Sequence, residues 1–231
     1  MGRASQIPLL LLPVAALMLL GHFSHASAVA FPDSLSSIVR FTSKFEGEAE
    51  ECGPQLSIET PKCKVVEKRD GYELRSYPKG QIWVQTVVED SSYTVATLVG
   101  FYRCFYFISG QNEKKMAIEM TGPVLIKPVP EKSGYSISFF APSRFASPDD
   151  LPKPNDSQLK FVETEETIQA VIGPFGGFPT ASDYTKKWEE LKSKLDKDGV
   201  KYDESTLFYA GYSSPFEIFN RKQEVHVILS K

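Results

Sequence analysis

The segment VATLVGFYRCFYFISG, residues 95–110, limits the fold more than any other part of the chain. It is almost entirely apolar or aromatic, and Arg103 is its single charged residue. Such a segment either lies in a core or forms one wall of an apolar binding groove, because exposing this much apolar surface to water is unfavourable. Local propensity favours a strand, since aromatic residues are enriched in strands. The order of the surrounding elements instead favours a helix that begins near Ser91 or Ser92 and ends at Gly110.

Short alternating runs around this segment predict an antiparallel sheet. One run, residues 81–89, places Ile82, Val84, Thr86 and Val88 on one face. The other predicted strands are YELRSY (72–77), MAIEMTGPVLI (116–126), YSISFF (135–140), TIQAVIG (167–173), LFYAGY (207–212) and EVHVIL (224–229). Runs this short, separated by turn residues, are typical of an antiparallel sheet or barrel.

A second helix is predicted over residues 179–199, PTASDYTKKWEELKSKLDKDG. Ser182 or Thr180 is its expected N-cap, and its apolar face is Tyr184, Trp188, Leu191 and Leu195. Strands, a helix and two further strands then occur twice along the chain, with residues 95–109 in the first helical position. This order predicts two α+β halves joined through a Pro-rich loop.

The first 28 residues have the pattern of a secretory signal peptide. Arg3 is followed by an apolar run from Ile7 to Leu20 and by small residues at Ala26 and Ala28. We therefore expect a secreted, extracellular protein whose mature chain starts near Val29. Residues 29–62 are expected to form an N-terminal extension. No other segment of the chain is long and apolar enough to span a membrane.

Charge and histidine content exclude several kinds of site. The formal net charge is −3, and it becomes one unit more negative once Arg3 is removed. A mildly acidic, mixed surface gives no basic patch for nucleic acid. His22 and His25 leave with the signal peptide, so His226 is the single histidine expected in the mature chain. This excludes metal sites built from several histidines.

Two covalent modifications are predicted. Cys52 and Cys63 bracket the loop CGPQLSIETPKC, and we expect them to form a disulfide in an oxidising compartment. Cys104 is then the odd cysteine and is expected to pack as a small apolar side chain. Asn155 begins the glycosylation sequon Asn-Asp-Ser in a polar loop, which predicts a glycoprotein.

Three pieces of sequence carry a resemblance to a known family. They are GYELRSY (71–77), YFISGQNEKKMAIEMTGPV (106–124) and YAGYSSPFEIFNRKQEV (209–225). In these pieces the chain resembles the SOUL haem-binding family, over roughly residues 63–229, so we assign residues 63–231 as a SOUL domain. The resemblance implies an α+β fold, a distorted antiparallel β-barrel built from two βαββ-like halves with a helix packed on each side. It also implies a reversibly, non-covalently bound haem or other tetrapyrrole in a shallow apolar groove beside the first helix.

The chain departs from the family pattern at two positions. Some members have a histidine, proposed as an iron ligand, in the strand where this chain has Ser76. The family usually ends with a tryptophan where this chain has His226. The first change removes the proposed ligand, and the second supplies a histidine elsewhere, so the axial ligand stays open. A lone histidine on a terminal strand is usually a polar surface residue, and we expect His226 to be one, with iron ligation as the alternative.

The predicted ligand-binding residues lie mainly on the first helix. As a helix, residues 95–108 are apolar around most of their circumference, so something besides the sheet must cover them. We expect the ligand to contact seven residues: Leu98, Val99, Tyr102, Arg103, Phe105, Tyr106 and Phe175. Arg103 is expected near the haem propionates. The alternative is that the protein's own N-terminal extension, SLSSIVRFTSKF, covers this face.

The sequence therefore predicts a secreted, monomeric haem-binding protein that is not an enzyme. No nucleophile–base pair and no metal-ligand spacing stand out in the sequence. The main alternative is an extracellular interaction or host-defence protein whose apolar helix contacts another protein or a lipid. A third is a hydrolase with a pocket carboxylate of raised pKa, for which Glu119 is the expected residue.

Overall fold

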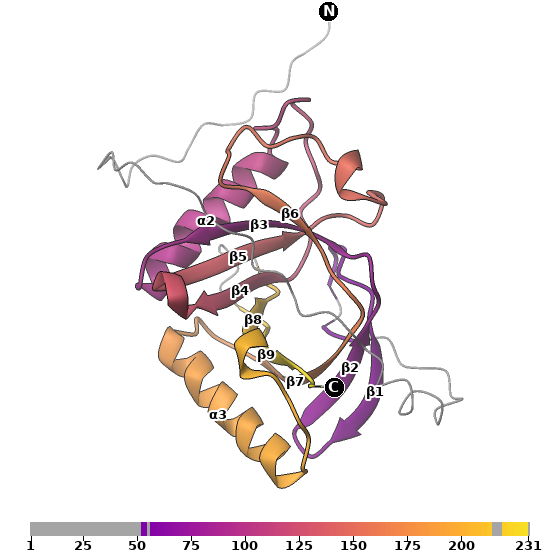
Figure 1. Ribbon diagram of the computed structural model, residues 1–231, viewed down its shortest axis with the longest axis vertical. Helices are drawn as coiled ribbons and strands as arrows, with labels where there is room; N and C mark the ends of the chain where they lie inside the picture. Colours follow the sequence, from indigo (N-terminus) through magenta and orange to yellow (C-terminus); the bar gives the residue numbers. More distant parts are fainter. Residues whose placement is uncertain (1–51, 55, 214–218, 231) are drawn as a thin grey trace, which may run out of the picture. The chain divides into compact units, whose positions relative to one another are not determined.

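Nine β-strands and two α-helices make up the regular structure of the computed structural model, which describes residues 52–54, 56–213 and 219–230 (Figure 1). The helices are α2 (Tyr93–Ile108) and α3 (Ala181–Lys197). The first-half strands are β1 (Lys64–Arg69), β2 (Tyr72–Tyr77), β3 (Ile82–Val88), β4 (Val124–Val129) and β5 (Gly134–Phe140). The second-half strands are β6 (Lys160–Glu163), β7 (Thr167–Phe175), β8 (Phe208–Gly211) and β9 (Gln223–Ile228). The predicted signal peptide and residues 29–51 of the predicted extension lie outside the described residues.

All strands join one antiparallel sheet in the order β1-β2-β7-β9-β8-β4-β5-β3-β6. The chain order β3-α2-β4-β5 is repeated as β7-α3-β8-β9. The two halves pair at three places, β2 with β7, β3 with β6, and β4 with β8, where Leu125 lies opposite Ala210. The predicted α+β class and the repeated βαββ order are therefore confirmed.

The predicted closure into a barrel is not confirmed, because the sheet is open at β1 and β6. It nevertheless curls strongly. The Gly80 amide donates to the Thr164 carbonyl at 2.9 Å, and the Thr164 amide donates to the Gln81 carbonyl at 2.9 Å. These two hydrogen bonds join the β2–β3 connection to the β6–β7 connection. The curl that results gives the sheet an outer face, covered by both helices, and a concave inner face (Figure 1).

Helix α3 forms where the sequence predicts it. Thr180 is the N-cap, with its Oγ accepting from the Asp183 amide at 3.3 Å and the Asp183 carboxylate accepting from the Thr180 amide at 2.9 Å. The predicted apolar face, Tyr184, Trp188, Leu191 and Leu195, is buried in the core against β7 and β9.

Helix α2 confirms the helical interpretation of the apolar segment. The Ser92 side chain caps its N-terminus, and Gly110, with φ of 102°, follows its end. The residues that face β3 and β5 are small: Ala96, Gly100 and Cys104 are buried there. Close approach is needed at Gly100, because a Cβ added there would lie 2.6 Å from Ile137 Cγ1 on β5. The helix therefore rests directly on the sheet along its small residues.

Replacing Gly100 with alanine tests this close approach. Gly100→Ala should lower the free energy of unfolding by about 2 kcal/mol, because a Cβ 2.6 Å from Ile137 puts the cost at the upper end of the about 1–3 kcal/mol of core overpacking, and roughly 1 kcal/mol is regained in helix propensity. Urea unfolding monitored by circular dichroism measures this change in the free energy of unfolding.

The control for this variant is Gly176→Ala, where the added Cβ would lie 3.6 Å from its nearest neighbour, the Arg221 carbonyl. It should change stability by less than about 0.5 kcal/mol. Adding Ile137→Val to Gly100→Ala should recover part of the loss. A Gly100→Ala protein as stable as the unaltered one would contradict the described packing of α2.

Candidate functional site

The outer face of α2 exposes large apolar side chains. Five of them are 36 to 55% exposed: Val95, Leu98, Tyr102, Phe105 and Tyr106. The structure does not show the groove that was expected beside the helix. No described residue buries this face of α2 either. The alternative cover, the extension at residues 34–45, lies outside the described residues, so that alternative stays open.

The aromatic rings on this face lie in two parallel pairs. The rings of Tyr102 and Tyr106 are 5.8 Å apart with 29° between their planes, and those of Phe101 and Phe105 are 5.8 Å apart at 13°. The Phe101 ring also packs edge-on against Phe139 of β5, which fixes its position. Together the two pairs form an aromatic surface along about one and a half turns of helix.

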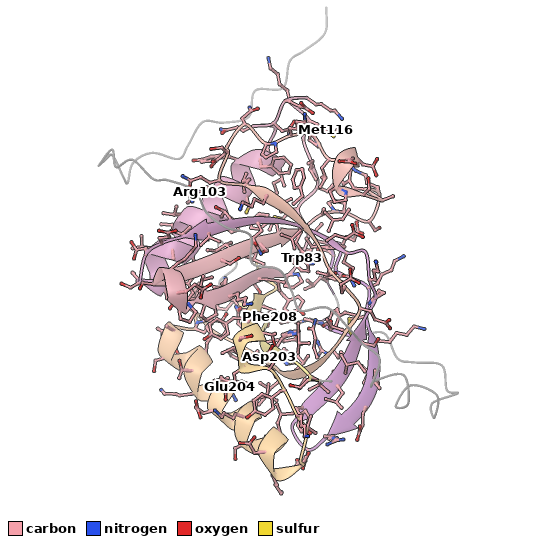
Figure 2. The ribbon with its side chains drawn as sticks, in the orientation of Figure 1. Trp83, Arg103, Met116, Asp203, Glu204 and Phe208 are labelled. Carbon is pink, nitrogen blue, oxygen red and sulfur yellow. A yellow bond between two sulfur atoms is a disulfide. The ribbon has the colours of Figure 1, made fainter. Side chains whose placement is uncertain are left out.

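Arg103 lies at the edge of this surface (Figure 2). Its Nη1 donates to Thr86 Oγ1 at 3.2 Å and to the Val87 carbonyl at 3.4 Å, while its Nε is 4.0 Å from the Asp156 carboxylate. These contacts hold the guanidinium beside β3. Val99, on the same flank of α2, is half-buried against the core.

Phe175 does not lie with the other six predicted ligand-binding residues. It is at the end of β7, where its ring packs edge-on against Tyr184 of α3 at 5.7 Å. Lys187 lies over the same ring at 5.9 Å. Phe175 therefore belongs to the core beneath α3.

The expectation that His226 is a surface residue is wrong. As predicted, it shares one face of β9 with Glu224 and Ile228, opposite the core residues Val225 and Val227. That face is the concave inside of the curled sheet, so His226 is only 2% exposed. An isolated strand pattern gives no sign of this curl, because it depends on pairing between distant strands.

Both ring nitrogens of His226 have partners. Nδ1 lies 3.0 Å from Gln169 Oε1, and Nε2 lies 3.1 Å from Glu224 Oε2. The imidazole also stacks on Phe208, with ring centres 4.8 Å apart. In this arrangement neither nitrogen is available to ligate iron.

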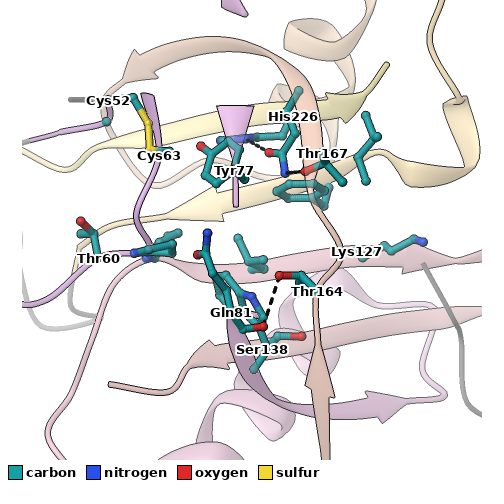
Figure 3. A pocket seen from close by; sticks show the side chains of 18 of the residues that line it. Cys52, Thr60, Cys63, Tyr77, Gln81, Lys127, Ser138, Thr164, Thr167 and His226 are labelled. Atoms are coloured by element: carbon teal, nitrogen blue, oxygen red, sulfur yellow. Dashed lines mark hydrogen bonds between the residues drawn. A yellow bond between two sulfur atoms is a disulfide. The ribbon is translucent and has the colours of Figure 1, made fainter. Parts of the chain in front are cut away.

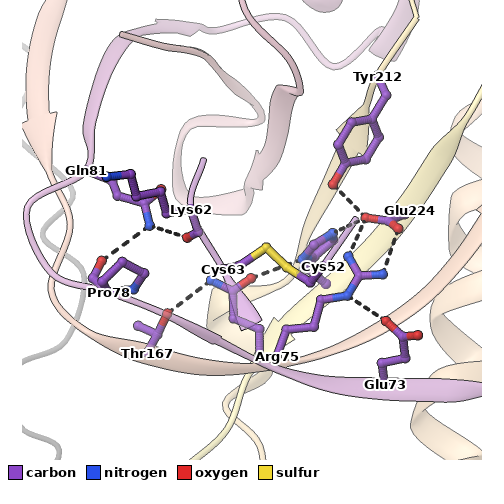
Figure 4. The surroundings of a disulfide bond; sticks show 12 residues. Cys52, Lys62, Cys63, Glu73, Arg75, Pro78, Gln81, Thr167, Tyr212 and Glu224 are labelled. Atoms are coloured by element: carbon purple, nitrogen blue, oxygen red, sulfur yellow. Dashed lines mark hydrogen bonds and ion pairs between the residues drawn. A yellow bond between two sulfur atoms is a disulfide. The ribbon is translucent and has the colours of Figure 1, made fainter. Parts of the chain in front are cut away.

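A buried ion pair lies next to His226. Both terminal nitrogens of Arg75 donate to the two carboxylate oxygens of Glu224 at 2.9 Å, and the Tyr212 hydroxyl donates to Glu224 at 2.6 Å (Figure 4). Arg75 is 3% exposed and Glu224 is fully buried. Bidentate pairing of this kind satisfies charges that would otherwise be costly to bury. Sequence reasoning missed this pair, since Arg75 and Glu224 are 149 residues apart.

Burial and pairing set the protonation of this group. Burial alone would raise the pKa of Glu224, but hydrogen bonds and charge from His226 and Arg75 outweigh it and lower the pKa to about 2. Burial lowers the pKa of His226 below its usual range, although Glu224 acts in the opposite direction. At neutral pH we therefore expect an ionised Glu224 that accepts from Nε2–H of a neutral His226, whose unprotonated Nδ1 lies against the Gln169 side chain.

The concave face of the sheet also contains an open pocket that sequence reasoning missed. Its volume is about 980 Å³, including its opening. Figure 3 shows Thr60 and the Cys52–Cys63 disulfide at one end and Lys127 toward the other. The disulfide itself was predicted and is present.

Other predicted residues lie away from both surfaces. Ser76 is on β2, which pairs with β1 and β7, whereas α2 packs on β3 and β5. Cys104 is buried, which raises the pKa of its thiol. Asn155 is exposed in a loop, and its glycosylation stays a prediction.

Glu119 does not have the raised pKa that the hydrolase alternative requires. It is exposed and pairs with Arg144 at 2.6 Å, and a hydrogen bond from its own backbone amide together with Arg144 lowers its pKa. Within residues 52–54, 56–213 and 219–230, no three acidic, cysteine or histidine side chains are grouped to hold a metal ion. Neither helix in this part of the chain is long and apolar enough to cross a membrane.

The fold and site define an α+β protein with an exposed aromatic helix surface and a concave sheet. The chain belongs to the SOUL family, since the family described as "SOUL heme-binding protein" matches residues 58–228, well over half of its length.

Similar proteins agree with this assignment. Heme-binding protein 2 of Homo sapiens is 34% identical over 191 residues, which cover 79% of this chain and 91% of the human protein. Heme-binding protein 2 of Mus musculus is 32% identical over 181 residues, covering 74% and 86%. A solved structure titled a hydrolase from Listeria innocua is 14% identical, with a TM-score of 0.45, and covers 69% of this chain and 91% of that one. A similarity that low supports no conclusion about function.

The lowered pKa of His226 predicts a pH-dependent stability. Because the folded protein binds this proton less tightly than the unfolded chain, the free energy of unfolding should fall as pH drops below about 6.5, the unfolded value. Urea unfolding at pH 7, 6 and 5 measures the slope.

The His226→Gln variant keeps a neutral hydrogen-bonding side chain but removes the titrating group. Between pH 7 and 5, the free energy of unfolding of this variant should fall clearly less than that of the unaltered protein. Carboxylates with lowered pKa, such as Glu224, act at lower pH, because their unfolded values lie near 4.5. Equal slopes in the two proteins would contradict the buried, neutral state of His226.

Proposed function

We propose that this protein reversibly binds haem or a related tetrapyrrole on the outer face of α2. The observation that carries the proposal is the set of five large apolar side chains exposed on one side of a single helix. Membership of a haem-binding family supports a tetrapyrrole as the ligand.

A flat ligand suits this face better than an irregular one. Burying a large apolar side chain stabilises by about 1.5–3 kcal/mol, so the exposed residues offer a substantial favourable term to any molecule that covers them. The rings stack within each pair, whereas Phe101 and Tyr102 meet edge to face at 85°, so a planar ligand would contact both ring edges and ring faces, and aromatic rings pack favourably in both ways. Haem is a planar macrocycle with two carboxylates, and Arg103 at the edge of the surface supplies a positive charge for one of them.

The residues present fit a haem held mainly by stacking. His226 is the single histidine among the described residues, and it is buried on β9 with both nitrogens bonded. The oxygen donors on the α2 face are the phenols of Tyr102 and Tyr106, and tyrosine is a known haem ligand. The proposal therefore assigns no histidine ligand, and Phe175 is left out because it lies in the core under α3.

We also propose that the protein is secreted as a monomer, glycosylated at Asn155, and acts as a binding protein rather than an enzyme. The apolar N-terminal run with small residues at Ala26 and Ala28 supports secretion. The exposed position of Asn155 and the Cys52–Cys63 disulfide fit an extracellular protein.

Two acidic substitutions on α2 test the proposed site. Leu98→Glu with Tyr102→Glu should weaken haemin binding at least about 10-fold, because two apolar contacts are lost and the new carboxylates repel the propionates. Both side chains are exposed, so the fold should be retained. Titration of the Soret band and of tryptophan emission measures the affinity, and circular dichroism checks the fold.

The matched control adds the same two charges elsewhere. Thr185→Glu with Ser193→Glu changes the exposed side of α3 and should leave haemin affinity unchanged. Equal affinity in the α2 variant and the control would place the ligand elsewhere. If the unaltered protein fails to bind haemin but floats with liposomes, the lipid-interaction alternative replaces the proposal.

A further inference from the structure

The pocket on the concave face is separate from the α2 surface. Residues from seven strands line it, and none of its lining residues belongs to α2. Side chains alternate along a strand, so the residues next to the core positions point into it. On β5, Ile137 and Phe139 face α2, whereas Ser136 and Ser138 face the pocket. A molecule in the pocket and a molecule on α2 would thus lie on opposite faces of the sheet.

Aromatic side chains form two sides of the pocket. Trp83 of β3 lies on one side, held by Phe140 behind it with ring centres 5.5 Å apart. Tyr77 and the stacked pair of Phe208 and His226 line the other half of the sheet. Figure 2 shows Trp83 and Phe208 within the curl of the sheet. Two aromatic walls favour a flat ring between them.

Uncharged hydrogen-bonding groups lie between these walls. The Gln85 amide donates to Ser138 Oγ at 3.2 Å, and the Gln169 amide donates to Thr167 Oγ1 at 3.0 Å. Ser136 is 4% exposed, and its Oγ has no hydrogen-bond partner among the described residues. A buried hydroxyl without a partner is unfavourable, and a small shift of the surrounding side chains would let a ligand atom pair with it.

Most charge around the pocket is already balanced. Glu165 at the rim lies 3.6 Å from Lys79. Arg75 and Glu224, beside His226, form an ion pair with each other. Burial lowers the pKa of Lys127, which opposes its charge, while Asp203 and Glu131 act in the opposite direction. An anionic ligand would meet Lys127 as the single lysine or arginine among the described lining residues, and burial already disfavours the charge of that lysine.

The disulfide loop covers one end of the pocket. Cys52, Cys63, Thr60 and Pro61 line that end (Figure 3). The Gln81 side chain donates to the Lys62 carbonyl at 2.9 Å, which ties the loop to the sheet (Figure 4). The pocket is thus bounded by the fold on several sides.

We propose that this pocket is a second binding site, for a neutral aromatic or heteroaromatic molecule that carries both hydrogen-bond donors and acceptors. The ring lies between Trp83 and the Phe208–His226 pair. Its polar edge bonds to Ser136, Gln85 and Gln169.

Three indole probes that differ in charge test the class of ligand. Indole-3-acetamide is neutral, indole-3-acetate is an anion and tryptamine is a cation. Each is added at about millimolar concentration to the ¹⁵N-labelled protein. The amide should shift the indole N–H signal of Trp83 and the side-chain amides of Gln85 and Gln169, and leave Trp188 unchanged. The chain has two tryptophans, so Trp188→Phe assigns the signals.

A pair of hydroxyl variants locates the polar contact. Ser136→Ala should weaken the binding of indole-3-acetamide about 3- to 10-fold, as expected for one lost hydrogen bond. The free energy of unfolding should not fall. Thr97→Val is the control, because Thr97 Oγ1 is the other buried side-chain oxygen without a hydrogen-bond partner in the described part of the chain, and Thr97 lies on α2, outside the pocket. The affinity of the Thr97→Val variant for indole-3-acetamide should not change.

Three results would overturn the proposal. The first is no shift at Trp83 with the neutral probe, and the second is tighter binding of the anion or the cation than of the amide. The third is displacement of indole-3-acetamide by haemin, which would place the tetrapyrrole itself in this pocket. Loss of haemin binding in the α2 variant with unchanged indole-3-acetamide binding would support two separate sites.

Discussion

The contact between Gly100 of α2 and Ile137 of β5 determines how the apolar helix is used. Because there is no room for a Cβ between them, the helix meets the sheet through its small residues. Five large apolar side chains are consequently exposed, although Phe107 and Ile108 at the end of the helix are buried. An ordinary amphipathic helix buries most of its large apolar residues. Helix α3 shows the ordinary arrangement, with Trp188 and Leu191 buried. The two helices occupy equivalent positions in the repeat, so the difference comes from sequence rather than topology.

The curl of the sheet explains the second feature of the molecule. Both helices cover the outer face, which leaves the residues of the inner face to satisfy one another. The Arg75–Glu224 pair, the His226 contacts and the neutral amides of Gln85 and Gln169 do so. Their hydrogen bonds hold the inner face open as a pocket instead of collapsing it into an apolar core. A protein of this size thereby has two surfaces of different chemistry, one apolar and outward, the other mixed and enclosed.

Sequence patterns predicted most of the local structure, but the strand predicted over residues 116–126 was wrong for residues 116–123, because β4 begins only at Val124, after the Gly122–Pro123 break. Period-two alternation located β3, β5 and β7, the capping residues located both helices, and cysteine spacing predicted the Cys52–Cys63 disulfide. What the patterns missed depends on strand pairing across the chain. From the pattern of β9 alone, His226 is predicted to lie on the surface. In the structure, β9 lies between β7 and β8, and side chains from these two strands contact the His226 ring. The pocket and the position of Phe175 under α3 escaped prediction for the same reason.

The central claim is that the outward aromatic face of α2, and not the concave pocket, receives the tetrapyrrole. Ferric haem broadens nearby amide signals in a ¹⁵N spectrum, and zinc protoporphyrin serves as the diamagnetic reference. The account predicts broadening at Leu98, Tyr102 and Tyr106 while the Trp83 indole signal stays sharp. Broadening at Trp83 and His226 with sharp α2 signals would contradict it.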